Sequence, residues 1–132
     1  MNLWRIHLKP ASKSGTDSRK YCIDNKIVGF GWPIQDVNAL LSSSEYEEKG
    51  KVLYANNGDK SWYPAWNSLH YKMQIGDLVW TRKQDGVYYL GRITGDWRYE
   101  YSKSSEEADI VNVRNCDWIK IGTVGDCKMN SV

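Results

Sequence analysis

The chain contains few of the residues on which catalysis, metal binding and disulfide bonding usually depend. Its 132 residues include two histidines, three cysteines, three prolines and one phenylalanine. Because the cysteines are odd in number and lie far apart, they argue against a disulfide framework and a paired zinc motif. The scarcity of histidine leaves few general bases. We therefore expect no metal, no cofactor and no catalytic site in this chain, with any catalysis supplied by a separate domain or partner.

Long apolar runs are also missing. No stretch approaches the roughly 20 apolar residues of a membrane span, and the first residues lack the apolar core of a signal peptide. The net charge of +2 is too small to identify a partner by itself. We predict a cytoplasmic protein with no membrane partner. It should form one domain over residues 1–122, followed by a C-terminal tail over residues 123–132.

Tryptophan and tyrosine, in contrast, are abundant. Seven tryptophans and nine tyrosines stand against the single phenylalanine, and many of them fall within residues 29–32 and 80–101. A buried indole N–H or phenol O–H needs a hydrogen-bond partner, so these residues favour surfaces with one wet edge. The bias indicates that some rings line a ligand site.

The first half of the chain predicts a strand over residues 3–8, a helix over 18–25 and a short strand over 27–33. A helical pattern follows from Asp36 to Leu41 or further, and the polar stretch 45–60 is expected to be an irregular connection. Four residues at steps of three and four predict the core face of another helix: Trp62, Trp66, Leu69 and Met73.

The second half has the pattern of strands. We predict a hairpin from residues 78–82 and 87–94, joined at Asp85-Gly86, and an alternating strand over 97–101. A polar loop over 102–107 then precedes two strands, 110–114 and 118–121. This order predicts an α+β domain in which a curled, mostly antiparallel β-barrel or sheet is flanked by helices.

The strand half also carries arginines near the aromatic residues. Stacking of a base on an aromatic ring contributes roughly 1–3 kcal/mol, and arginines around such a ring would contact phosphates. The predicted phosphate contacts are Arg82, Arg92, Arg98 and Arg114. Aromatic rings with a basic rim favour a nucleic-acid-binding module.

Several short motifs resemble the EVE and YTH branch of the PUA-like domains when taken in order. They are Trp4 in the first strand, Gly29-Phe30-Gly31-Trp32 after the first helix, Met73 to Val79, and Tyr89-Leu90-Gly91-Arg92-Ile93. The run Asp109 to Arg114 and the following Trp118-Ile119 resemble the strand pair of YTH-type members. The resemblance spans roughly Leu3 to Ile121.

The resemblance implies a PUA-like β-barrel whose aromatic cage holds a modified, for example methylated, or flipped base of DNA or RNA. Several members form the reader part of modification-dependent restriction systems, which implies an effector domain or partner protein. Trp32 and Trp97 match the cage tryptophans, with Phe30 and Tyr99 as supporting rings. The base-edge candidates, by position, are Ser12, Ser14, Asn25 and Asp96. Pro33 has no counterpart in the pattern.

Two other readings remain open. Gly76 to Trp80 resembles the opening strand of Tudor and PWWP domains, whose aromatic cages bind methylated lysine through cation–π attraction. A small metal-dependent nuclease would use Asp77, Asp85 or Asp96, although aspartate beside glycine is also common in turns. His7 and His70 are expected to be structural or surface residues.

Overall fold

The computed structural model describes residues 1–8, 15–35, 40–82 and 85–122. The strands are β1 (Leu3–Arg5), β2 (Ile27–Phe30), β3 (Leu78–Arg82), β4 (Tyr88–Ile93), β5 (Arg98–Tyr99) and β6 (Asn112–Gly122). The α-helices are α1 (Ser18–Asp24), α2 (Ser43–Leu53), α3 (Trp62–Trp66) and α4 (Lys103–Ala108). A 3₁₀ turn, Ala55–Asn57, follows α2, and a π-helical turn, Asn67–Lys72, extends α3.

The six strands form one mixed sheet in the order β1-β3-β4-β6-β2, with β5 paired to β6. β1 runs parallel to β3, and the other pairings among the described strands are antiparallel. The predicted α+β class is therefore confirmed. Within the described residues the sheet is not closed into a barrel, because β1 and β2 stand at opposite ends of this order.

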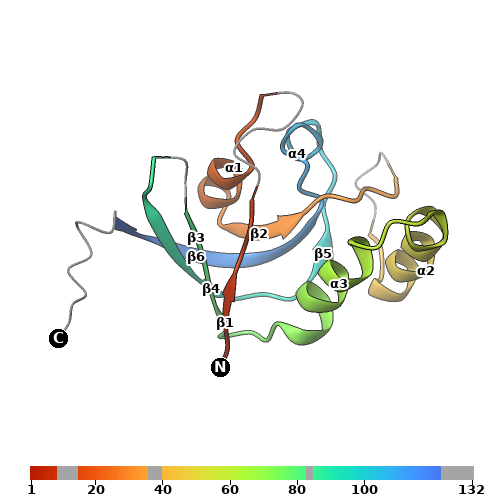
Figure 1. The fold of residues 1–132 in the computed structure, drawn as a ribbon, viewed down its shortest axis with the longest axis horizontal. Coiled ribbons are helices and arrows are strands. Elements are labelled where there is room, and N and C mark those ends of the chain that lie inside the picture. The colour runs from red at the N-terminus through yellow and green to blue at the C-terminus, as the bar shows by residue number, and fades with distance from the viewer. Residues whose placement is uncertain (9–14, 36–39, 83–84, 123–132) are drawn as a thin grey trace.

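Strand β6 joins the two parts of the sheet. Its second part, residues 116–122, pairs with β4, whereas residues 112–115 pair with β2, and Asn112 and Val113 also pair, on the other side, with β5. The two strands predicted over 110–114 and 118–121 are thus one long strand. Figure 1 shows β6 passing along the whole sheet, so this strand connects β2 at one end with the β3–β4 hairpin at the other.

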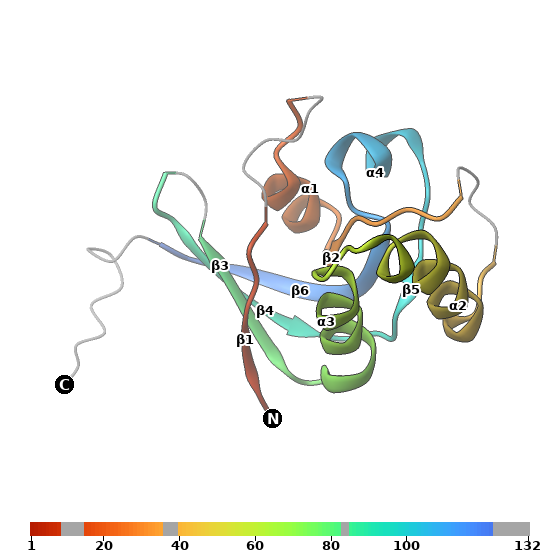
Figure 2. The same cartoon turned by 45° about the vertical axis from the view of Figure 1, so that its right-hand side comes forward.

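The helices lie in two pairs. α1 lies beside α4, where the Ser18 hydroxyl donates to the Ala108 carbonyl at 2.6 Å. α2 lies beside α3, where Trp62 Nε1 donates to the Tyr46 hydroxyl at 3.1 Å. The two views in Figures 1 and 2 show both pairs. None of the described helices is long and apolar enough to cross a membrane.

Most predicted elements are confirmed, including the core face of the third helix. Trp62 and Trp66 are fully buried, and Leu69 and Met73 nearly so. α1 begins after Asp17, whose carboxylate accepts from the backbone N–H groups of Arg19 and Lys20. Cys22 and Cys116 are buried, as small hydrophobic residues would be, whereas Cys127 lies outside the described residues.

Two predicted loops are wrong, since residues 45–60 and 102–107 are largely helical. In both helices a capping box compensates for the lack of apolar residues: Ser42 with Glu45 before α2, and Ser102 with Ser105 before α4. α2 buries only Tyr46 and Gly50, so its sequence shows little periodicity. The helix predicted at 36–41 falls partly outside the described residues, and helix α2 begins only at Ser43.

Candidate functional site

Trp32 adopts a backbone conformation that is unusual for a bulky residue. It follows β2 with φ at +56°, in the left-handed region. Such a conformation costs about 1–3 kcal/mol and persists only where surrounding contacts impose it. Two contacts do so: indole Nε1 donates to Asp59 Oδ2 at 2.9 Å, and the Trp32 carbonyl accepts from the Tyr46 hydroxyl at 2.9 Å. The half-buried ring is thereby held in one orientation.

This ring lines a cavity of about 540 Å³, which we call the Trp32 cavity. Phe30 meets Trp32 edge to face, with 5.3 Å between ring centroids. Tyr54, at the end of α2, supplies a third ring and donates its hydroxyl hydrogen to the Pro33 carbonyl. The cavity lies between the β2 end, α1 and the segment after α4, and its volume falls within the roughly 300–1,000 Å³ of small-ligand pockets.

Two glycines allow the backbone to approach closely at the back of this cavity. A Cβ on Gly29 would lie 1.9 Å from the Asn112 carbonyl oxygen, and a Cβ on Gly31 would lie 2.1 Å from Asp109 Oδ1. Glycine at both positions is therefore required by the packing of β2 against β6 and of Asp109 against the loop. The Gly-Phe-Gly-Trp motif shapes the cavity wall.

Polar groups of the Trp32 cavity come from residues that sequence reasoning missed. Ser18 is buried and lines the wall, as does Asp109, which has a φ of +58° directly after α4. Asp59 also lines it, and the hydrogen bond from the Trp32 indole, together with two backbone N–H groups, lowers the pKa of its carboxyl. The only sequence signals were a helix start at Ser18 and a polar residue just before a strand at Asp109.

Trp97 lies in a different place. It lines a second cavity, of about 630 Å³, which we call the Trp97 cavity, together with His70, Asp96 and Arg114. Its ring packs edge to face on Trp66 with 5.2 Å between centroids. Trp32 and Trp97 are therefore not two walls of one cage in this structure.

Tyr99, the other supporting ring, is in the core. It is 5% exposed, and its hydroxyl donates to the Gln35 carbonyl at 2.7 Å while accepting from the backbone N–H groups of Ile34 and Gln35. Of the four predicted cage rings, Trp32 and Phe30 share one cavity, Trp97 lines another, and Tyr99 supports the loop that follows Trp32.

Asn112 connects the two cavities. Its buried amide donates to the Gly31 carbonyl at 2.6 Å and to the Tyr46 hydroxyl at 2.9 Å, while its oxygen accepts from Trp97 Nε1 at 2.9 Å. The Tyr46 hydroxyl in turn donates to Trp32 and accepts from Trp62 and Asn112. Each polar atom of this buried network is satisfied, as buried polar groups need to be.

A model of the DUF8426 family, described as a domain of unknown function, matches residues 4–130. The chain belongs to this family. No curated protein and no solved structure matches it.

The predicted base-edge residues are dispersed in the DUF8426 domain. Asn25 is exposed at the end of α1, where its amide donates to the Tyr21 carbonyl at 2.8 Å, and it does not line the Trp32 cavity. Asp96 lines the Trp97 cavity. Ser12 and Ser14 lie outside the described residues.

The four predicted phosphate contacts also differ from one another. Arg114 is buried, donates to the carbonyls of Leu69, Met73 and Gly95, and has its pKa lowered by desolvation. Arg98 pairs with Glu100 at 3.0 Å. Arg92 is exposed on the open face of the sheet, and Arg82 is exposed at the end of β3. Of these four arginines, Arg114 alone is buried.

The open sheet face carries the rings that a Tudor-like site would use. The guanidinium carbon of Arg5 lies 5.1 Å from the centroid of Trp80, and that of Arg82 lies 5.5 Å from Tyr88. These rings of the DUF8426 domain thus already carry cations from the same chain.

Two of the three aspartates considered for a nuclease site, Asp77 and Asp85, serve structural roles, and Asp96 lines the Trp97 cavity. The buried Asp77 carboxylate accepts from two backbone N–H groups and from Trp4 Nε1, which lowers its pKa. Asp85 accepts from the Val87 backbone N–H. In the part of the chain that the structure describes, no three His, Cys, Asp or Glu side chains are grouped so that they could hold a metal ion.

Proposed function

We propose that this domain binds a modified or flipped nucleobase of DNA or RNA in the Trp32 cavity. The observation that carries the proposal is the Trp32 ring itself. It is held in a strained conformation by Asp59 and Tyr46, and it faces a cavity that two further rings, Phe30 and Tyr54, also line. Strain of this kind concentrates at ligand-binding sites.

We assign a different role in recognition to each residue of the cavity. The face of Trp32 stacks on the base, a contact worth roughly 1–3 kcal/mol, and Phe30 fixes the ring orientation. Ser18 and Asp109 are the groups we assign to the base edge, since the Ser18 oxygen, whose hydrogen is donated to Ala108, and a carboxylate can both accept from exocyclic amines and ring N–H groups. Trp97 is not part of this cage and instead supports it through Asn112.

We further propose a PUA-like architecture of the EVE and YTH type, with a modified base as ligand and an effector domain or partner protein as the executor of any reaction. The helix-flanked sheet and the position of Trp32 shortly after β2 support this assignment, whereas the described strands do not close into the barrel that the resemblance implies. A cytoplasmic location and a role in a restriction or defence system are part of the same proposal.

A methyl-lysine reader remains the second candidate, with the Trp32 cavity as its site. Its supporting observation is that Asp59 and Asp109 place carboxylates beside three rings, a combination that also suits a methylated ammonium group.

The test is binding of fluorescently labelled oligonucleotides, single- and double-stranded, with methylated and hydroxymethylated bases, beside a methyl-lysine peptide panel. We expect one modified oligonucleotide to bind best and Trp32→Ala to weaken it by about 10- to 100-fold. Trp97→Ala, checked for folding by circular dichroism, is the matched control and should weaken binding much less. Equal binding by Trp32→Ala and the parent protein would refute the proposal, and selective peptide binding would favour the second candidate.

A further inference from the structure

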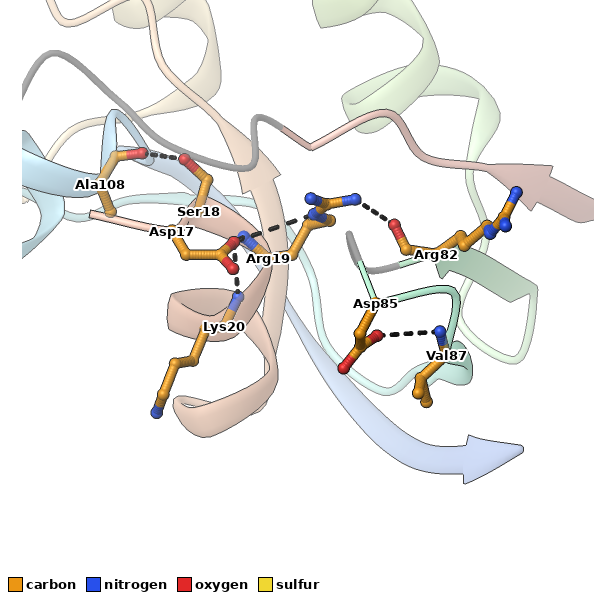
Figure 3. A network of polar contacts seen from close by, with 8 residues as sticks. All are labelled: Asp17, Ser18, Arg19, Lys20, Arg82, Asp85, Val87 and Ala108. Carbon is orange, nitrogen blue, oxygen red and sulfur yellow. Dashed lines mark hydrogen bonds and ion pairs between the residues drawn. The ribbon is translucent and has the colours of Figure 1, made fainter. Parts of the chain in front are cut away.

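Arg19 is a buried arginine whose hydrogen-bonding capacity is largely unused. Its side chain, on α1, is 10% exposed, and Nη1 donates to the Arg82 carbonyl at the end of β3. Figure 3 shows the guanidinium group reaching from the helix to this strand. Nε and Nη2 are buried and have no hydrogen-bond partner among the described residues.

Asp17 does not satisfy this group. Its Oδ1 lies 3.8 Å from Arg19 Nε, within ion-pair range but too far for a hydrogen bond. The same oxygen accepts from the backbone N–H groups of Arg19 at 2.9 Å and Lys20 at 3.3 Å, where it caps α1. A buried charge with unsatisfied donors costs free energy unless a ligand completes it.

The two free nitrogens share one edge of the planar guanidinium group. Their N–H bonds point the same way, which is the arrangement that binds two oxygens of a phosphate or carboxylate at once. This role of Arg19 could not be predicted from the sequence, because a single arginine on a helix is ordinary.

Arg19 lines a cavity of about 420 Å³ between the ends of β1 and β3, which we call the Arg19 cavity. Arg5, His7, Thr81 and Arg82 also line it. Arg5 and Arg82 are exposed and are positioned by their contacts with Trp80 and Tyr88. The described lining residues include three arginines and no carboxylate; the Asp17 carboxylate, which is not among the lining residues, lies 3.8 Å from Arg19 Nε.

We propose that the Arg19 cavity binds a phosphate group. Three arginines favour an oxyanion that carries several acceptor oxygens, and the free edge of Arg19 supplies a bidentate contact. His7 and Leu8 line both this cavity and the Trp32 cavity, so the two adjoin. The phosphate is accordingly assigned to the nucleic-acid backbone beside the bound base; this assignment of the source, but not the anion site, rests on the proposed function.

The first test titrates the full chain with sodium phosphate and follows the arginine Nε–H signals by NMR, with sodium chloride of equal ionic strength as the control. We expect a saturable shift of the Arg19 signal with phosphate and none with chloride. An unmoved Arg19 signal, or the same shift with chloride, would overturn the proposal.

Variants then separate a binding role from a structural one. Arg19→Lys keeps the charge but removes the planar edge, and phosphate affinity should fall at least about tenfold. Because Arg19 also holds β3, Arg5→Gln provides a second variant at an exposed position. It should weaken phosphate binding with an unchanged melting temperature. Arg92→Gln, an exposed arginine outside the cavity, is the matched control; a loss equal to that of Arg5→Gln would contradict a defined site.

The second arm identifies the source of the phosphate. Methylphosphonate replaces single linkages beside the modified base of an oligonucleotide, which removes one backbone charge at a time. One such replacement should weaken binding by the parent protein more than it weakens binding by Arg19→Lys, which retains the charge but not the planar edge. If phosphate moves Arg19 and no oligonucleotide binds, the anion site stands and the nucleic-acid function fails. If oligonucleotides bind and phosphate leaves Arg19 unmoved, the anion site fails alone.

Discussion

The Trp32 and Trp97 cavities are each lined by one half-buried tryptophan, yet they are built in different ways. Trp32 has a left-handed backbone conformation, and the half-buried Asp59 accepts a hydrogen bond from its indole N–H. The wall of its cavity includes two glycines and two further aromatic rings. Trp97 is held by the buried Asn112, and Arg114 in its cavity is bonded to backbone carbonyls. The first arrangement places the ring beside a cavity, as the proposed ligand site requires, whereas the second packs the ring against the core residue Trp66.

This difference shows that tryptophans cannot be grouped by residue type and spacing alone. The two tryptophans differ in the residue that accepts the hydrogen bond from the indole N–H and in the backbone conformation of the tryptophan itself. The buried polar network around Asn112 ties both rings together, so perturbing it should affect both cavities.

The largest effect is therefore expected for Asn112→Ala. It leaves the Gly31 carbonyl and the Trp97 indole without a partner, each at about 1–3 kcal/mol, so the free energy of unfolding should fall by roughly 3 kcal/mol or more. Urea denaturation measures this. Asn115→Ala, at an exposed asparagine on the same strand that accepts from Arg98, should change it by about 1 kcal/mol or less. Similar losses in the two variants would show that the network does not connect the cavities.

A smaller effect on stability should distinguish the backbone conformations of Trp32 and Trp97. At position 32 glycine tolerates the left-handed conformation that alanine resists, so Trp32→Gly should be more stable than Trp32→Ala by about 1 kcal/mol. Trp97 is not among the described residues with positive φ, and there the order should reverse by about 0.5–1 kcal/mol. Thermal unfolding of the four variants measures both differences. The same order at both positions would remove the strain argument.

The sequence predicted elements with strong periodicity well, because burial dictates their pattern. Trp62, Trp66, Leu69 and Met73 lie on one buried face as expected, and the β3–β4 hairpin has the predicted strands. The sequence pattern did not predict helices α2 and α4, because their stability comes from capping boxes rather than from an apolar face.

Site residues were predictable only where a motif marked them. Trp32 and Phe30 follow from the Gly-Phe-Gly-Trp motif. Tyr54 lies in the stretch 45–60, whose pattern predicts a loop. Asp109 and Arg19 reach their cavities through contacts between segments that are distant in sequence. Whether Trp97 and Trp32 share a cavity depends on how β2 and β5 pair with β6, and the sequence pattern does not predict this pairing.

The smallest effect concerns pH and should be confined to the Trp97 cavity. Burial against Trp66 lowers the pKa of His70 below its ordinary value of 6.5. The folded state therefore binds a proton less readily than the unfolded state, and stability should decrease as pH falls below about 6.5. Urea midpoints at pH 7.5 and 5.5 measure the decrease. His70→Gln should reduce it, and an undiminished decrease in that variant would assign the effect to other groups.

The most direct test of the central claim follows the indole N–H signals of all seven tryptophans by NMR during titration with the best-binding modified oligonucleotide. Stacking of the base on Trp32 should produce the largest shift at its Nε1–H, while the Trp97 signal, shielded by Asn112, moves little. A large shift at Trp97 with Trp32 unmoved would place the ligand in the other cavity and contradict the account.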